Sequence, residues 1–219
     1  MYTGIVVVAA LTGLYTIIGG LMAVVVTEAI QTVVLVLGAA VITYFAWERM
    51  GGWEPMVEML QQKEETAKLS MLRPHGDGDG LPWYAVFLGY PVLGIWYWCA
   101  DQTIVQRVLG ARDEQHARVG PLFAGLIKVL PVFIFVLPGL LAYTLVQSGG
   151  LDISSLSQVN EAGETEIDSK GIYGVMITQL LPQGLIGLMV AALLAALMST
   201  VAGALNSIST LFSYDLYKR

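Results

Sequence analysis

Residues 189–212 read "MVAALLAALMSTVAGALNSISTLF", and this stretch decides the fold. It carries no charged residue and is long enough to cross a hydrocarbon core, because a spanning helix needs about 20 predominantly apolar residues. Its later part nevertheless holds a series of oxygen-bearing side chains: Ser199, Thr200, Asn206, Ser207, Ser209 and Thr210. The stretch therefore predicts a membrane helix that uses polar groups for packing or for binding.

The composition of the whole chain agrees with a membrane protein. Of its 219 residues, 56% are hydrophobic and only 13% are charged, and the mean hydropathy is +0.68. One soluble core could not bury so much apolar surface. The acidic residues that give the net charge of -6 gather in polar stretches between apolar runs, and nothing suggests nucleic-acid binding. Cys99 has no partner for an intramolecular disulfide, and no metal cluster is indicated.

Five apolar runs predict five transmembrane helices in an all-α membrane protein. They cover about residues 2–18, 21–46, 81–108, 121–146 and 185–216. The pair Gly19-Gly20 predicts a tight turn between the first two spans. A long polar loop at about 47–80 separates the second and third spans, and another at about 147–184 separates the fourth and fifth. The first of these loops contains a short surface helix within residues 55–69.

The order of spans and loops also predicts an orientation. Both long loops lie on one side, and the short connector of residues 107–120 lies on the other. That connector holds Arg107, Arg112 and Arg118 close to span ends, which favours the cytoplasm under the positive-inside rule. We expect a multi-pass protein of the plasma or inner membrane, with its N-terminus outside and its C-terminus in the cytoplasm.

The polar stripe of the last span has two interpretations. Small residues spaced three and four apart let helices approach closely, and Ser or Thr can bond back to helix carbonyls. Alternatively, the Ser199 and Thr200 hydroxyls and the Ala196 carbonyl are oxygen ligands for a cation. Such a site lacks carboxylates, so it would suit a monovalent ion.

The third span contains aromatic and charged residues at unusual depth. Tyr97 and Trp98 could belong to an interfacial belt, but they lie near mid-membrane, where aromatic faces suit a polyhydroxylated ligand. Asp101 is either a functional intramembrane carboxylate or a structural hydrogen-bond anchor. Arg107, near the end of the run, could be a snorkelling anchor.

Two further charged residues lie in apolar runs. Lys128 could snorkel, donate to sugar hydroxyls or pair with a carboxylate on a neighbouring helix. Glu28 could line the exit route of an ion or accept hydrogen bonds from a neighbour. The sequence leaves both choices open.

Three segments resemble consecutive signatures of the sodium/solute symporter family, in its sodium/glucose cotransporter branch. They are "GGLMAVVVTEAIQTVVLVLG" (19–38), "WYWCADQTIVQRVLGAR" (96–112) and "GLMVAALLAALMSTVAGALNSISTLFSYDLY" (187–217). The resemblance implies a partial LeuT-type core, which in full consists of two inverted five-helix repeats. The five spans would be the last two helices of the first repeat and the first three of the second. We therefore expect a middle fragment of a larger transporter whose remaining helices are missing from this chain.

The resemblance also assigns roles to residues. Ala196, Ser199 and Thr200 match the family's sodium site, and Tyr97 matches the aromatic inner gate that stacks on the sugar. Trp98 matches the neighbour of that gate, and Lys128 the lysine that meets a sugar hydroxyl. Glu28 replaces the usual aspartate on the proposed sodium exit, while Asp101 and Arg107 remain structural polar residues. Gly94 stands where some members bond the sugar, so the exact substrate is open.

The implied function is sodium-coupled symport of a sugar or related polyol by alternating access, with no enzymatic chemistry. Sodium is the coupling ion, and the lipid bilayer surrounds the chain. Two other classes compete with this function. The first is a symporter-like membrane sensor domain of a signalling protein, and the second is a purely structural helical bundle.

Overall fold

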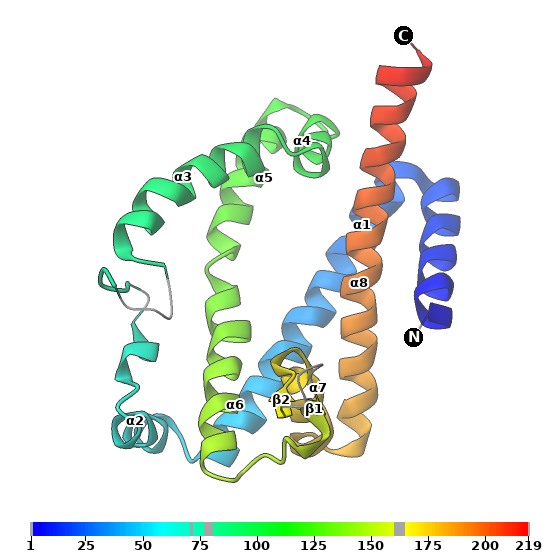
Figure 1. Cartoon of the computed structure of the whole chain (residues 1–219). Helices are drawn as coiled ribbons and strands as arrows, with labels where there is room; N and C mark the ends of the chain where they lie inside the picture. Colours follow the sequence, from blue (N-terminus) through cyan, green and yellow to red (C-terminus); the bar gives the residue numbers. More distant parts are fainter. Residues whose placement is uncertain (1, 71, 77–80, 160–164, 219) are drawn as a thin grey trace. The chain divides into compact units, whose positions relative to one another are not determined.

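The computed structural model describes residues 2–70, 72–76, 81–159 and 165–218, which are nearly all helical (Figure 1). In chain order the elements are α1 (Tyr2–Met50), α2 (Trp53–Gln62), η1 (Thr66–Leu69), α3 (Trp83–Cys99), α4 (Gln102–Leu109), α5 (Glu114–Ile127), η2 (Val132–Val136), α6 (Leu137–Gln147), η3 (Ser154–Leu156), β1 (Ser157–Val159), β2 (Thr165–Ile167), η4 (Ser169–Gly171), α7 (Ile172–Leu180), α8 (Gln183–Leu211) and η5 (Phe212–Tyr217). The segments η2 and η5 are π-helical, and the other η segments are 3-10 helices.

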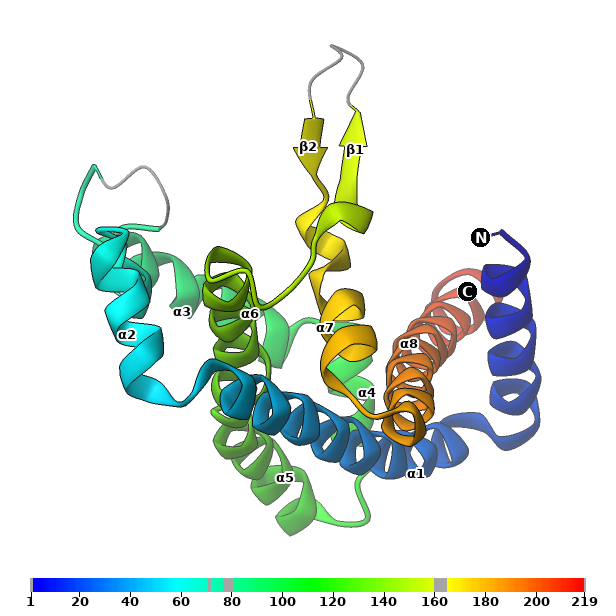
Figure 2. The same cartoon turned by 90° about the horizontal axis from the view of Figure 1, so that it is seen from below.

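The predicted all-α class holds for nearly all of the described residues, and two details correct the second long loop. Strands β1 and β2 lie side by side and pair antiparallel (Figure 2). In this pairing Ser157 lies opposite Ile167. Pairing the two strands satisfies backbone groups that a polar loop would leave to water. The predicted loop at 147–184 also contains α7, whose Val175, Met176 and Ile177 are buried. The burial of these apolar side chains stabilises the helix.

Glycine at position 20 divides α1 into the two predicted spans. Gly20 has φ +58° and ψ -157°, a backbone conformation that side chains with a Cβ rarely adopt. A Cβ at the preceding Gly19 would overlap the Ala23 side chain. The predicted turn at the glycine pair is therefore confirmed as a break within α1.

Three helical segments among the described residues are long and apolar enough to cross a membrane: Tyr2–Met50, Glu114–Gln147 and Gln183–Tyr217. The predicted number was five. The first two predicted spans share the helix α1, and the predicted span 81–108 is divided into α3, with 17 residues, and α4, with 8. The broken third run therefore gives no single helix of spanning length.

The predicted connector at 107–120 is shorter than expected. Helix α4 continues to Leu109, and α5 already begins at Glu114. The Asp113 side chain caps α5 by accepting a hydrogen bond from the His116 amide at 2.8 Å. Capping thus extends the helix into a polar sequence that hydropathy alone assigns to a loop.

The chain forms two compact units. The first contains Met1–Leu35, Leu72–Lys128 and Ala192–Arg219, and the second contains Val36–Met71 and Val129–Ala191. The second unit has a core of fully buried side chains that includes Ile42, Met56, Leu60, Leu141 and Met176. Met56 and Leu60 belong to α2, which confirms a helix in the first part of the range 55–69. The first unit holds Tyr97, Arg107 and Lys128.

Candidate functional site

Tyr97 and Trp98 lie in the last turn of α3, and their rings meet edge to face. The ring centroids are 5.4 Å apart, with an interplanar angle of 87°. Helix α3 ends at Cys99, and the Trp96 carbonyl accepts hydrogen bonds from the amides of Ala100 and Asp101. This helix end places two aromatic rings beside a break in the backbone.

Asp101 starts the next helix. Its side chain accepts a hydrogen bond from the Ile104 amide at 3.2 Å and so caps α4. An acidic side chain at a helix N-terminus is stabilised by the unpaired amides and by the helix dipole. The geometry of Asp101 therefore matches a structural anchor.

Lys128 reaches the same aromatic pair from α5. The helix ends at Ile127 with Lys128 as its C-cap, close to Pro131, which has no N–H to continue the ladder. The Lys128 Nζ lies 3.6 Å from the centroid of the Tyr97 ring and 5.0 Å from that of Trp98. Both distances are within the range of cation–π attraction.

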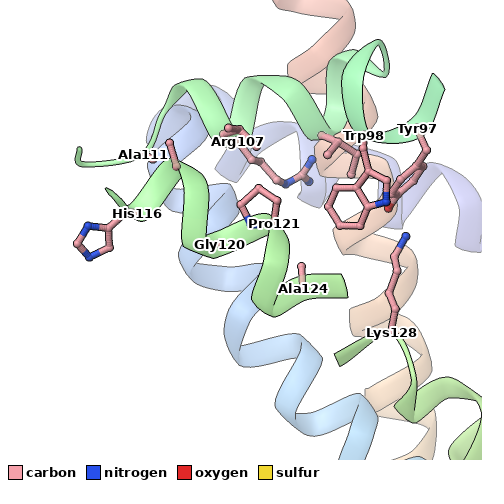
Figure 3. A pocket seen from close by; sticks show the side chains of 12 residues that line it. Tyr97, Trp98, Arg107, Ala111, His116, Gly120, Pro121, Ala124 and Lys128 are labelled. Atoms are coloured by element: carbon pink, nitrogen blue, oxygen red, sulfur yellow. The ribbon is translucent and has the colours of Figure 1, made fainter. Parts of the chain in front are cut away.

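These three side chains line one cavity of about 250 Å³ between α3, α4 and α5. Figure 3 shows the Lys128 side chain directed towards the two aromatic rings, with Arg107 and His116 further along the lining. The rest of the lining is mainly apolar: Ile104, Val108, Ala111, Ala117, Gly120, Pro121 and Ala124. Apolar walls with a few polar groups at defined places are typical of a small-molecule site.

The predicted sodium ligands lie on one face of α8. The Thr200 hydroxyl donates to the Ala196 carbonyl at 3.0 Å, and Thr200 is exposed while Ser199 is half-buried. The structure therefore brings Ala196 and Thr200 oxygens together. This back-bond also fits ordinary helix packing, so the geometry leaves both interpretations of the stripe open.

Glu28 and Arg107 form an ion pair that the sequence interpretation did not foresee. The Arg107 Nη2 donates to Glu28 Oε1 at 2.6 Å, and Nε donates to Oε2 at 3.1 Å. The sequence places the opposite charges of Glu28 and Arg107 in two different apolar runs, which is compatible with an ion pair. It does not show, however, that these two residues are partners. Glu28 thus accepts hydrogen bonds from a neighbour, one of the two roles considered for it.

A second polar contact joins α4 to α8. The Gln106 amide donates to the Ser207 hydroxyl at 2.9 Å, and that hydroxyl lies 2.8 Å from the Gly203 carbonyl and 3.2 Å from Thr103 Oγ1. Gln106 and Ser207 are both buried. Neither was among the predicted site residues, although Ser207 belongs to the polar series of the last span.

One electrostatic feature lies at the start of α5, outside the candidate spans. The backbone hydrogen bond from His116, followed by the contact with its ring, holds the pKa of the Asp113 carboxyl below its usual range. The His116 Nδ1 is 2.7 Å from Asp113 Oδ1. This cap positions His116, which lines the cavity.

Comparison with known proteins identifies the class to which this arrangement belongs. The family model "Sodium:solute symporter family" matches residues 1–219. The chain belongs to the sodium:solute symporter family. This family and the curated relatives below are transporters and not enzymes.

The curated relatives include cotransporters for several solutes. The chain is 38% identical over 234 residues to a sodium/mannose cotransporter of Bos taurus, covering 100% of this chain and 38% of the relative. It is 34% identical over 238 residues to sodium/glucose cotransporter 1 of Sus scrofa, covering 100% and 36%. Sodium/myo-inositol cotransporter 2 of Sus scrofa is 37% identical over 233 residues, covering 99% and 34%. The chain thus spans little more than a third of the length of these relatives.

A solved structure of similar fold is a Na⁺-coupled sialic acid symporter in a substrate-bound, outward-open state. The TM-score is 0.77 with 26% sequence identity, and the match covers 98% of this chain and 43% of that one. The fold of this chain is therefore that of part of a sodium-coupled symporter.

Proposed function

We propose that this chain is part of a carrier that couples the inward movement of Na⁺ to that of a sugar or related polyol by alternating access. The single observation that carries the proposal is the cavity in which Tyr97, Trp98 and Lys128 meet. Membership of a family of sodium symporters supports the coupling ion, and the names of the curated relatives support a polyhydroxylated solute.

The chemistry of the cavity suits such a solute. A sugar can lay its C–H face on an aromatic ring while its hydroxyls find donors and acceptors at the ring edge. Lys128 offers three N–H donors beside the Tyr97 ring. The solute would take the ring face that the ammonium now covers, and the ammonium would then donate to a hydroxyl. Tyr97 and Trp98 are the proposed stacking and gating residues, and Lys128 is the proposed hydroxyl donor.

The oxygens of α8 form the proposed half of a sodium site. Ala196 supplies its carbonyl, and Ser199 and Thr200 supply hydroxyls, which together suit an ion without a second charge. Other ligands would come from helices of the carrier that lie outside this chain. Each Na⁺ that moves inward gains about 2.3 kcal/mol per 100 mV of membrane potential, and this free energy drives solute uptake.

The proposed carrier has a LeuT-type core to which this chain contributes five spanning segments. These would be the two halves of α1, α3 with α4, α5 with α6, and α8. The N-terminus would lie outside and the C-terminus in the cytoplasm, with the Arg-bearing α4–α5 connection also inside. The sodium-exit role predicted for Glu28 stays a prediction, and its ion pair with Arg107 supports a different role.

The decisive experiment is uptake by the complete carrier in proteoliposomes. We expect mannose, glucose or myo-inositol to accumulate under an inward Na⁺ gradient, accompanied by an inward current. Equal accumulation in potassium-only medium without current would reject the proposal. A carrier that binds a solute without moving it would instead favour the sensor alternative.

A further inference from the structure

The ion pair between Glu28 and Arg107 joins two helices of the first unit. Both oxygens of the carboxylate accept hydrogen bonds from one guanidinium, the fork geometry in which Arg binds a carboxylate most strongly. The side chains are 15% and 25% exposed, so the pair lies mostly out of solvent. Arg107 Nη1 also donates to the Thr103 carbonyl, which fixes the side chain against its own helix.

A glycine of α8 makes room for this pair. A Cβ added at Gly203 would lie 2.8 Å from Arg107 Nη2, 3.3 Å from Thr103 Cγ2 and 3.5 Å from Glu28 Oε1. The first distance is shorter than real Cβ contacts, so any larger residue would displace the guanidinium. The close approach of α8 to the ion pair therefore depends on the missing side chain at position 203.

The neighbours of the pair connect it to both proposed sites. On α8, Gly203 follows Thr200 by one helical turn. On α4, Arg107 lines the cavity that holds Tyr97 and Lys128. The buried contact of Gln106 with Ser207 holds α4 to α8 one turn further along. The ion pair thus lies where the proposed sodium helix meets the helix that follows the aromatic gate.

We propose that the Arg107 guanidinium, and not a sodium ion, is the cation that neutralises the Glu28 carboxylate. This ion pair packs against Gly203 and positions α4 against α1 and α8 during transport. Glu28 is then a positioning residue and not a ligand on the sodium exit. A sodium ion could use Glu28 only after displacing the guanidinium from both carboxylate oxygens, which would leave a mostly buried cation unpaired. This inference rests on the proposed symport.

The test is a double-mutant cycle in the complete carrier with Glu28→Gln, Arg107→Gln and the double variant. We expect each single variant to lower turnover at least tenfold, and the double variant to be no slower than the worse single one, because the second change removes a charge that the first left unpaired. The half-saturation constants for Na⁺ and for the solute should stay within about twofold of the wild type, as for a loss of positioning rather than of a ligand. A merely structural role would change the amount and melting temperature of the carrier but not turnover per folded molecule.

Two results would overturn the inference. The first is additive effects of the two substitutions. The second is a tenfold higher Na⁺ constant in Glu28→Gln but not in Arg107→Gln, which would make Glu28 a sodium ligand. Arg107→Lys keeps the charge without the bidentate geometry, and we expect it to restore only part of the turnover.

Gly203→Ala tests the packing of α8 against the ion pair without changing any charge. Its matched control is Gly187→Ala in the same helix, where an added Cβ would meet no atom within 4 Å. We expect Gly203→Ala to lower both turnover and melting temperature, whereas the control leaves both unchanged. Equal effects of the two substitutions would contradict the proposal.

These outcomes can be told apart from failure of the proposed function. If the wild-type carrier showed no sodium-driven uptake, the symport would fail, yet the same cycle could be measured by thermal unfolding of the purified protein. If the effects of the two substitutions on the melting temperature were non-additive, the ion pair would still hold α1, α4 and α8 together, but its role in transport would be rejected. If these effects were additive, the contact between the three helices would be rejected as well.

Discussion

The ammonium of Lys128 lies 3.6 Å from the centre of the Tyr97 ring, over the face on which the proposed solute would stack. The two residues come from the end of α5 and the end of α3, and the Trp98 ring stands at 87° to that of Tyr97. In this arrangement the ammonium covers one face of the aromatic ring. Solute binding would therefore exchange a cation–π contact for stacking and a hydrogen bond.

Replacing Tyr97 by alanine should weaken solute binding through loss of the ring. We expect the solute half-saturation constant to rise at least tenfold, equivalent to about 1.4 kcal/mol, and the Na⁺ constant to change much less. Tyr97→Phe should retain most of the affinity, since the ring face remains. Tyr90→Ala, on an exposed ring of the same helix, is the matched control. Unchanged affinity in Tyr97→Ala, measured by tracer uptake, would contradict the gate assignment.

Lys128→Met should separate the hydrogen bond from the bulk of the side chain. Methionine keeps a long apolar stem but has no N–H donor, so we expect at least about tenfold weaker solute binding, as for one charged hydrogen bond lost. A deoxy solute that lacks the contacted hydroxyl should bind the wild type and the variant equally. If every deoxy analogue loses as much affinity in the variant as the parent solute does, Lys128 has no direct contact with a hydroxyl.

The α8 hydroxyls can be tested one at a time. Ser199→Ala and Thr200→Ala should each raise the half-saturation constant for Na⁺ about tenfold, because each removes one proposed oxygen ligand; a tenfold change corresponds to about 1.4 kcal/mol. The exposed Ser209 of the same helix provides the control Ser209→Ala. Wild-type sodium dependence in both variants would leave the stripe with its packing role only.

The sequence predicted the membrane class and the glycine break because both depend on local properties. Hydropathy marks apolar runs, and a glycine at position 20 adopts the positive φ of the turn without steric cost. The break between α3 and α4 was harder to predict, because Asp101 lies within an apolar run and could be interpreted as a functional intramembrane carboxylate. Its preference for a helix N-cap was the signal that competed with that interpretation.

Contacts between distant residues limited the prediction of the site. Tyr97, Trp98 and Lys128 were selected from their depth in apolar runs and from the family resemblance, and only the structure places all three in one cavity. Glu28 and Arg107 are 79 positions apart, and no local pattern pairs them. The packing of Gly203 against the ion pair can be recognised only when α1, α4 and α8 are placed together, because the missing Cβ would contact residues of the other two helices. Such features arise from tertiary packing, which periodicity and composition do not encode.

The start of α5 should respond to pH through Asp113. Hydrogen bonds from His116 lower the pKa of this carboxyl in the folded protein. A lowered pKa means that the ionised cap contributes stability above the unfolded pKa of about 3.9, and that this contribution is lost as the pH falls through the folded value. Hydrogen exchange at the His116 amide is the direct measurement, with wild type and variants compared at the same pH.

At pH 7, Asp113→Ala should exchange this amide about fivefold faster than the wild type, because the side-chain acceptor of the N-cap is missing. As the pH falls below the folded pKa, the difference should shrink, since the wild-type carboxyl becomes neutral. Asp113→Asn is the matched control: asparagine also caps helices but does not titrate, so its protection should not depend on pH in this way. If the wild type and Asp113→Asn kept the same relative protection from pH 7 down to pH 2, ionisation of Asp113 would contribute nothing to the cap. The helix start, and with it the position of His116 at the cavity, would then depend on the hydrogen-bond geometry alone.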